Sequence, residues 1–171
     1  MPAPSTRTIP TAPGSTARLV RALARALPAR HAQVAVAESC TAGLLGAALT
    51  ARSGSSAYFN GGVIVYANAA KTSLLAIAPA LLARHGAVSA PVARHMACAV
   101  RRRLAATFGI AITGVAGPTG GTPRTPVGTV WLGLAGPRVC CVRRLQLAGT
   151  RAQIRAQAVR AALALLAEHL V

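Results

Sequence analysis

Ser39 combines a residue type and a position that are typical of a nucleophile. It lies in the segment Glu38-Ser39-Cys40-Thr41-Ala42-Gly43, after a short apolar run and before apolar residues at helical spacing. A serine at this strand-to-helix turn would face the free N–H groups of the helix's first turn, which can hold an oxyanion. Position alone leaves a second role open, in which Ser39 only caps the helix. Cys40 is a rival nucleophile, because a helix N-terminus also favours a thiolate, but no histidine is obviously paired with it.

Lys71 is the candidate base for such a nucleophile, because it is the single lysine among 19 basic residues. Arginine does not release its proton in practice, whereas a desolvated lysine can, although its reference pKa is about 10.4. Composition alone leaves open that this lysine arose by chance drift at a position on a helix surface. Tyr66, at the end of a Val-rich segment, can relay or stabilise a proton between serine and lysine, or can be half-buried core with its hydroxyl at the rim.

The shortage of acids excludes several other chemistries. Glu38 and Glu168 are the only acidic residues, and the chain contains no aspartate. Paired catalytic carboxylates, a carboxylate-rich Mg²⁺ or Ca²⁺ site and a Ser-His-Asp triad are therefore not expected. The four cysteines form no CxxC pair and the histidines show no ligand spacing, so we predict no metal, no cofactor and no structural disulfide. Adjacent Cys140 and Cys141 indicate buried thiols on a strand.

The charge balance predicts affinity for anions. The formal net charge is +17, from 19 basic and 2 acidic residues. Nucleic acid and phosphorylated metabolites are both candidates for such a surface. The arginines are scattered, only Arg101-Arg102-Arg103 forms a run, and aromatic residues are 3% of the chain. A nucleic-acid surface usually clusters its charge and adds stacking rings, so this partner is not favoured but stays an alternative.

No apolar run reaches the roughly 18 residues that a membrane span requires. Residues 1–16 are rich in Pro, Ser and Thr and lack the apolar stretch of a signal peptide, so they are predicted to be a flexible tail. A cytoplasmic location without membrane contact is the resulting expectation.

Alternating helical and strand patterns over residues 17–171 predict one α/β domain, with three α/β/α layers and a mixed sheet. Helices are expected at 17–27, from 44, from Asn68 as N-cap, from Ser89 as cap to 106, and at 150–170. Strands are expected at 34–37, 62–66, 109–113, 127–134 and 139–145. A glycine- and proline-rich loop at 114–126 would let backbone amides approach a phosphate, although a plain long turn fits equally well.

Several segments, in the same order, resemble the CinA C-terminal domain family. They are Ala37-Glu38-Ser39-Cys40-Thr41-Ala42-Gly43, Gly54-Ser55-Ser56, Val65-Tyr66-Ala67-Asn68-Ala69-Ala70-Lys71, His85-Gly86-Ala87-Val88-Ser89, Thr113 to Gly121 and Pro126-Val127-Gly128-Thr129-Val130-Trp131. The resemblance runs from about Val34 to Ile154, and its several ordered motifs are more specific than any one of them.

The resemblance implies an amidohydrolase that deamidates nicotinamide mononucleotide to nicotinate mononucleotide and ammonia, without a metal. It places the nucleophile at Ser39, the base at Lys71 and an assisting tyrosine at Tyr66. The substrate-binding residues that it implies are Cys40, Thr41, Gly43, Thr113, Gly114, Gly117 and Arg151, with the ribose-phosphate near the 114–121 loop. It also implies a homo-oligomer, with a dimer expected, and a short stand-alone form of the family.

Two positions depart from the family pattern. The family loop usually carries an acid where this chain has Thr119, and its Asn-Glu-x-Lys pattern reads Asn68-Ala69-Ala70-Lys71 here. Both changes bear on substrate contacts more than on the serine–lysine pair. The alternatives are therefore the same fold acting on another small amide, and a nucleic-acid-binding or competence- and DNA-damage-associated regulatory protein.

Overall fold

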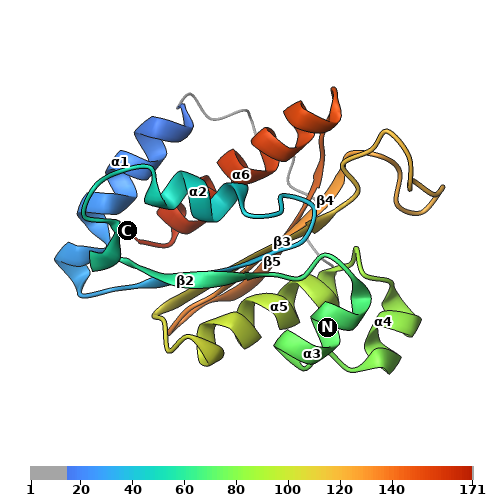
Figure 1. Cartoon of the computed structure of the whole chain (residues 1–171), viewed down its shortest axis with the longest axis horizontal. Coiled ribbons are helices and arrows are strands. Elements are labelled where there is room, and N and C mark those ends of the chain that lie inside the picture. The colour runs from blue at the N-terminus through green and yellow to red at the C-terminus, as the bar shows by residue number, and fades with distance from the viewer. Residues whose placement is uncertain (1–14, 171) are drawn as a thin grey trace.

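A five-stranded mixed sheet forms the middle layer of this computed structural model, which describes residues 15–170 (Figure 1). The strands are β1 (Val34–Glu38), β2 (Phe59–Ile64), β3 (Phe108–Gly114), β4 (Thr129–Ala135) and β5 (Cys140–Gln146). Their order across the sheet is β2-β1-β3-β4-β5. β1 pairs in parallel with β2 and β3, whereas β4 is antiparallel to both of its neighbours.

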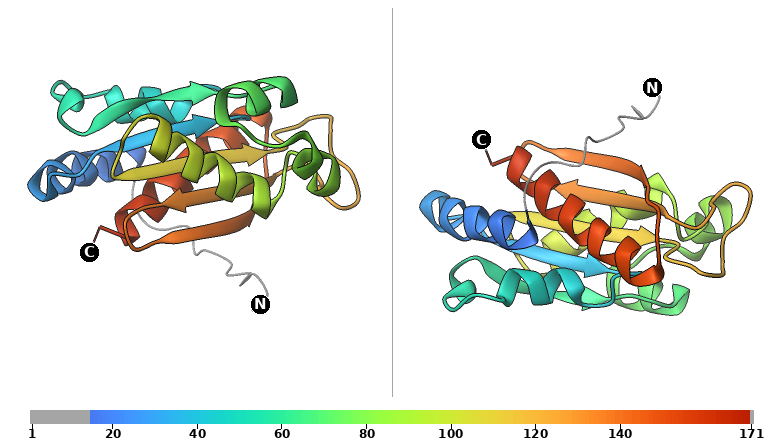
Figure 2. Two further views of the ribbon diagram at one scale, coloured as in Figure 1. Left: turned by 90° about the horizontal axis from the view of Figure 1, so that it is seen from below. Right: turned by 90° about the horizontal axis from the view of Figure 1, so that it is seen from above.

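Helices cover both faces of the sheet, which confirms the predicted three-layer α/β/α class with a mixed sheet. The helices are α1 (Thr16–Ala26), α2 (Leu44–Thr50), α3 (Asn68–Leu75), α4 (Pro79–His85), α5 (Ala90–Arg103) and α6 (Arg151–Glu168), with 3₁₀ turns η1 (Pro28–Arg30) and η2 (Ser55–Ala57). Figure 2 shows α1, α2 and α6 on one face and α3, α4 and α5 on the other. Two apolar cores result, one under each helical layer.

The alternation of side chains along the central strands determines how closely each layer packs. In β1, Val34 and Val36 face the core under α1, α2 and α6, whereas the small Ala35 and Ala37 face the core under α5. Glycines bring α5 closer still, because a Cβ at Gly109 or Gly133 would lie 2.2 Å from a carbonyl oxygen of α5. The alanine- and glycine-rich composition thus permits a helix to lie almost backbone to backbone on the sheet.

The clearest differences from the predicted elements concern β2, α3 and α4; in addition, β4 begins at 129 rather than 127 and α5 ends at 103 rather than 106. The second strand runs over 59–64 rather than 62–66, because its pairing with β1 begins at Phe59 and ends at Ile64. The N-cap of α3 is Ala67, and Asn68, the predicted cap, is already helical. Helix α4 was not predicted; it lies in the segment between the helices expected from Asn68 and from Ser89.

Most of the predicted N-terminal tail lies outside the part of the chain that the structure describes. Residues 1–14 of the predicted tail lie outside the described residues, and Thr16 already belongs to α1, whose N-cap Ser15 accepts a hydrogen bond from the Arg18 amide. None of the helices in the described range combines the length and apolar character needed to cross a bilayer.

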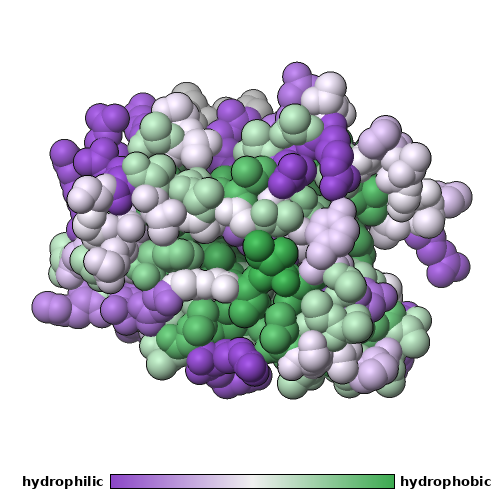
Figure 3. Space-filling view, viewed as in Figure 1, coloured by the Kyte–Doolittle hydropathy of each residue, from purple (hydrophilic) through white to green (hydrophobic). Residues whose placement is uncertain are grey.

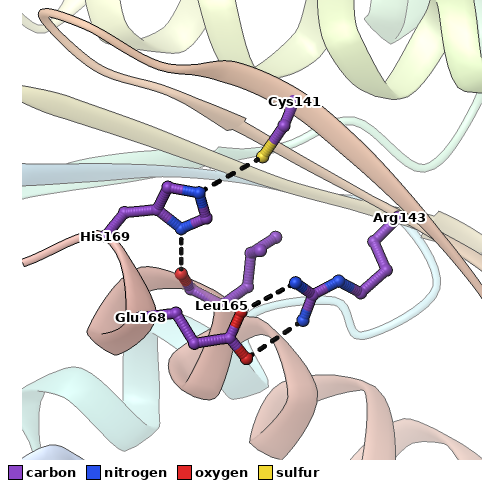
Figure 4. Close-up of polar contacts among 5 residues, drawn as sticks. All are labelled: Cys141, Arg143, Leu165, Glu168 and His169. Carbon is purple, nitrogen blue, oxygen red and sulfur yellow. Dashed lines mark hydrogen bonds and ion pairs between the residues drawn. The ribbon is translucent and has the colours of Figure 1, made fainter. Parts of the chain in front are cut away.

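Polar contacts connect the edge strand β5 to the end of α6 (Figure 4). Arg143 of β5 donates to both carboxylate oxygens of Glu168, at 3.1 and 2.7 Å. The His169 ring lies 2.9 Å from the Leu165 carbonyl oxygen through Nδ1 and 4.0 Å from Cys141 Sγ through Nε2. Arg143 holds the pKa of Glu168 below its usual range, but an ion pair this exposed adds at most about 1 kcal/mol to stability.

The prediction that Cys140 and Cys141 are both buried is wrong. They do lie on a strand, but Cys140 is exposed and Cys141 is partly buried. The reason is that β5 is the outermost strand of the sheet, so its side chains are incompletely covered. Within residues 15–170, no cluster of three or more His, Cys, Asp or Glu side chains is placed to hold a metal.

Apolar surface lies over β2 and α3, on the face that Figure 3 displays. The large apolar side chains that are exposed in the described part of the chain are Leu44, Ile64, Tyr66 and Leu74. Tyr66 also lines the pocket described below, so this surface adjoins the candidate site. The expected homo-oligomer stays a prediction.

Candidate active site

The carboxyl ends of the parallel strands β1 and β3 bring the site together. Ser39 follows the last residue of β1, and its amide donates to the Ile112 carbonyl at 2.9 Å, which extends the pairing with β3. Thr113 and Gly114 end β3 at the same edge of the sheet. Ligands in α/β folds bind at this edge, where the strands end. The strand register therefore places the serine next to the first residues of the glycine-rich loop.

Lys71 reaches Ser39 from the first turn of α3. Its Nζ lies 3.2 Å from Ser39 Oγ, 2.9 Å from the Val65 carbonyl oxygen and 3.1 Å from the Tyr66 carbonyl oxygen. The lysine side chain is buried, with 2% of its surface exposed. Burial lowers the pKa of Lys71 below its ordinary value.

As an ammonium, Lys71 would donate to all three oxygens, and the same contacts also suit a neutral amine. The two carbonyls of Val65 and Tyr66 accept the two N–H groups of the amine, and the lone pair then remains for the Ser39 hydroxyl. No carboxylate of residues 15–170 bonds to Lys71, and an adjacent carboxylate would favour the charged form. The geometry can therefore transfer the Ser39 proton to Lys71.

Glu38 holds the turn that carries Ser39. Its buried carboxylate accepts from the amides of Gly43 and Leu45 through Oε2, both at 3.1 Å, and from Gly46 through Oε1 at 2.8 Å. The prediction that the first-turn amides of the helix form an oxyanion hole is therefore wrong for these groups, because Glu38 occupies them. Helix α2 begins only at Leu44, five residues beyond Ser39.

Two amides of the turn remain as candidate oxyanion donors. The N–H groups of Cys40 and Thr41 have no oxygen acceptor among the described residues. Cys40 lines the pocket. The amide of the residue after a nucleophilic serine is a common component of oxyanion holes.

Arg155 of α6 supports the same turn from the other side. Its guanidinium donates to the Thr41 carbonyl at 2.8 Å. The Thr41 side chain is fully buried, and within residues 15–170 neither its hydroxyl nor Arg155 Nε has a hydrogen-bond partner. Of the predicted substrate-binding residues, Thr41 and Gly43 are not among the pocket-lining residues; they belong to the framework of the turn.

A pocket of about 240 Å³ opens above the serine and lysine. It is lined by Ser39, Cys40, Tyr66, Asn68, Lys71, Ala87, Val88, Thr113, Gly114, Val115, Ala116, Gly117, Thr119, Gly120 and Arg151. The predicted Tyr66, Cys40, Thr113, Gly114, Gly117 and Arg151 are thus brought together around the pair. Its volume suits a small molecule or part of one rather than a polymer.

Arg151 connects two walls of this pocket. Its guanidinium donates to the Gly117 carbonyl at 2.8 Å and to the Tyr66 hydroxyl at 3.0 Å. The Tyr66 hydroxyl therefore contacts Arg151, while the contact of Tyr66 with Lys71 is made by its backbone carbonyl. Among the described residues that line the pocket, Lys71 and Arg151 are the basic ones, Arg151 keeps its charge at any working pH, and no acidic side chain is present. The pocket is consequently suited to an anionic ligand.

Cys40 is poorly suited to act as the nucleophile. Cys40 is 5% exposed, and burial raises the pKa of its thiol to about 11. The thiol stays protonated at neutral pH, and the thiolate is the reactive form. Ser39 is therefore the stronger candidate of the two adjacent residues.

Glu38 and Arg155 are the functional residues whose roles sequence reasoning missed. In the sequence, Glu38 stands out only as one of two acidic residues, and Arg155 is one of many scattered arginines. A signal for Glu38 was present, since an acid buried between an apolar strand and a tight turn must find several N–H donors.

The fold and the site together define an α/β domain with a buried serine–lysine pair beneath a small cationic pocket. A model of the CinA C-terminal domain matches residues 16–170. This chain therefore belongs to the CinA C-terminal domain family.

Relatives and solved structures agree with this assignment. The CinA-like protein of Mycolicibacterium vanbaalenii is 52% identical over 134 residues, which are 78% of this chain and 32% of that protein. The CinA-like protein of a Cyanothece species is 57% identical over 119 residues, 70% of this chain and 28% of that protein. The chain thus spans about a third of the length of the curated relatives it matches.

Two solved structures share the whole fold. Competence damage-inducible protein A from Klebsiella pneumoniae superposes with a TM-score of 0.89 and 38% identity, covering 92% of this chain and 98% of that one. A CinA superfamily protein from Escherichia coli superposes with a TM-score of 0.89 and 33% identity, covering 96% of this chain and 95% of that one.

Proposed function

We propose that this chain hydrolyses the carboxamide of nicotinamide mononucleotide, giving nicotinate mononucleotide and ammonia. The observation that carries the proposal is the buried Lys71 Nζ, 3.2 Å from Ser39 Oγ, with its other two contacts on backbone carbonyls. The resemblance to CinA C-terminal domains supplies the substrate, and the cationic pocket supports a substrate that carries a phosphate.

In the acylation step, Lys71 takes the proton from Ser39 Oγ as the oxygen attacks the carboxamide carbon. The negative charge on the former carbonyl oxygen is received by the amide of Cys40, a residue that lines the pocket. The carbon–nitrogen bond then breaks, and the leaving nitrogen takes the proton from Lys71 and departs as ammonia. The product of this step is a nicotinoyl ester on Ser39.

In the deacylation step, water attacks the ester carbon while Lys71 removes a proton from it. Breaking the ester bond returns that proton from Lys71 to Ser39 Oγ and releases the carboxylic acid. Arg151 is the proposed phosphate ligand, because its guanidinium lines the pocket between Tyr66 and the 114–120 loop.

Ammonia release by the purified protein from nicotinamide mononucleotide tests the proposal. Ser39→Ala and Lys71→Met should each reduce turnover by at least 10³-fold, as expected for residues that act as a unit. Ser56→Ala is the matched control, because Ser56 is exposed and lies outside the pocket. Full activity in Ser39→Ala or Lys71→Met would eliminate the serine–lysine mechanism.

A panel of other amides separates the substrate from the mechanism. Thr119, where the family loop usually carries an acid, is the observation that favours a different amide, since it lines the pocket. Free nicotinamide, nicotinamide dinucleotides and amides without a pyridine ring would be compared with the mononucleotide. Ser39-dependent turnover of another amide, with none of the mononucleotide, would overturn the substrate and leave the mechanism standing.

A further inference from the structure

A pair of thiols lies outside the candidate active site. Cys98, in the middle of α5, and Cys140, the first residue of β5, have their sulfur atoms 3.6 Å apart. Cys140 pairs across the sheet with Ala135, and Ala135 pairs with Gly109 at the far end of β3 from the site. At about 3.3 Å per residue, Gly109 is roughly 17 Å along β3 from Gly114.

The fold brings these two thiols together and keeps the neighbouring cysteine away. Successive side chains of a strand point to opposite faces, so Cys140 faces α5 and Cys141 faces α6. Figure 4 shows Cys141 directed toward His169 at the end of α6. Cys98 packs against the α5-side core, whereas Cys141 packs against the other core. Only one cysteine of the adjacent pair can therefore reach Cys98.

We propose that Cys98 and Cys140 are a modification site that takes up low-molecular-weight disulfides and closes to an intramolecular disulfide. The sulfurs are already in van der Waals contact, and side-chain rotation must bring them to the roughly 2.05 Å of a disulfide bond. Neither Cys98 nor Cys140 lines the pocket of the candidate active site, so this proposal does not rest on the proposed function.

The exchange proceeds in two balanced steps. The thiolate of Cys140 attacks one sulfur of the small disulfide, which forms a mixed disulfide and expels one small thiolate. The thiolate of Cys98 then attacks Cys140 Sγ, forms the protein disulfide and expels the second small thiolate. In total, two protein thiols are oxidised, one small disulfide is reduced to two thiols, and two protons are transferred to solvent or to the leaving thiolates.

Exposure assigns the order of the two cysteines. Cys140 is exposed and can meet a small disulfide, whereas Cys98 is only partly exposed. Burial raises the pKa of Cys98, with Cys140 beside it adding to the rise, although the positive charges of Arg102 and Arg94 oppose it. These arginines also favour the approach of an anionic disulfide. Cys140 is thus the attacking thiol and Cys98 the resolving one.

The experiment treats the purified full chain with oxidised glutathione and counts thiols after unfolding, with intact mass and peptide mapping alongside. The wild type should fall from four thiols to two, carry no glutathione, and yield one peptide pair that joins Cys98 to Cys140. The Cys141→Ser variant should form the same link. The Cys98→Ser variant should stop with one glutathione on Cys140, and the Cys140→Ser variant should form no link.

The link should also stabilise the fold, because it closes a loop of about 40 residues between α5 and β5. The expected rise in Tm is roughly 5–15 °C, reversed by a reductant. A wild type that retains glutathione on Cys140 without closing, or a link that uses Cys141, would overturn the proposal. So would a link between two chains only. Since Cys140 is exposed, the Cys140→Ser variant should fold. An intramolecular disulfide in this variant would show that the link of the wild type does not require Cys140.

Discussion

Replacing Glu38 with glutamine tests whether the buried carboxylate positions the nucleophile. The carboxylate accepts three amide hydrogen bonds at 2.8–3.1 Å, and glutamine offers one oxygen and one NH₂ group in their place. At least one charge-assisted hydrogen bond is lost, which is worth about 1.5–3 kcal/mol. One buried backbone N–H then faces the NH₂ group of the glutamine and has no acceptor, which costs about 1–3 kcal/mol more. The expected loss of stability is therefore about 4 kcal/mol, a large share of the 5–15 kcal/mol typical of a folded domain.

The same substitution should also change catalysis in a way that lost stability alone would not. The turn contains Ser39 and the candidate oxyanion amides, and a displacement of about 1 Å at a reacting group can reduce a rate about 100-fold. We therefore expect kcat for ammonia release to fall about 100-fold below the melting range, while KM changes little, because Arg151 is untouched. Glu38→Asp keeps the charge on a shorter side chain, so its stability and its kcat should lie between those of the wild type and of Glu38→Gln.

Glu168→Gln is the matched control, because Glu168 is the second glutamate of the chain and is exposed by 48%. Its ion pair with Arg143 should contribute no more than about 1 kcal/mol, and its kcat should equal that of the wild type. Urea unfolding and steady-state kinetics on the three variants give both quantities. A Glu38→Gln variant with wild-type stability and kcat would refute the argument that this carboxylate holds the turn.

The remaining predictions concern the pocket. Because burial lowers the pKa of Lys71, the unfolded chain binds more protons than the folded one between that lowered value and 10.5, so stability should rise with pH across this window. Lys71→Met should abolish the rise in pH-dependent urea unfolding, and kcat/KM of the wild type should increase with pH as the amine becomes neutral. Arg151→Gln should raise KM for a phosphorylated amide about 10- to 100-fold and leave KM for the same amide without phosphate within about 3-fold, measured by ammonia release. Cys40→Ala should retain kcat within about 10-fold, because the thiol is protonated at neutral pH; a loss as large as that of Ser39→Ala would reassign the nucleophile.

The central elements were predictable because their sequence signals agree with their burial. β1 and β3 are apolar runs buried on both faces, and α6 begins with a capping box between Thr150 and Gln153. The edge strand β2 alternates between partly buried and exposed residues and contains two glycines, so its bounds were misplaced. Its register depends on pairing with β1, which a local pattern does not contain.

The candidate site was predictable only in part. Ser39 and Lys71, which share a hydrogen bond, are 32 residues apart in the sequence. The resemblance to a family, rather than a local pattern, identified the two residues as a pair. The contact of Arg155 with the Thr41 carbonyl spans 114 positions, and no spacing rule connects them. The role of Glu38 depends on a turn that aims three amides at one carboxylate. Such contacts depend on the tertiary fold, whereas residue type and order reveal only which groups are available.

The scarcity of acids in this chain is consistent with the use of a lysine base. A carboxylate beside Lys71 would favour the ammonium form and hold the proton that the proposed mechanism must release. In the described structure, Glu38 is occupied by three amides and Glu168 by Arg143, so neither glutamate reaches the lysine. The partners of Nζ, apart from Ser39, are instead two neutral carbonyls. Those neutral carbonyls favour the ammonium less than a carboxylate would, and burial favours the neutral amine, so a lysine in this setting can exchange a proton with a serine.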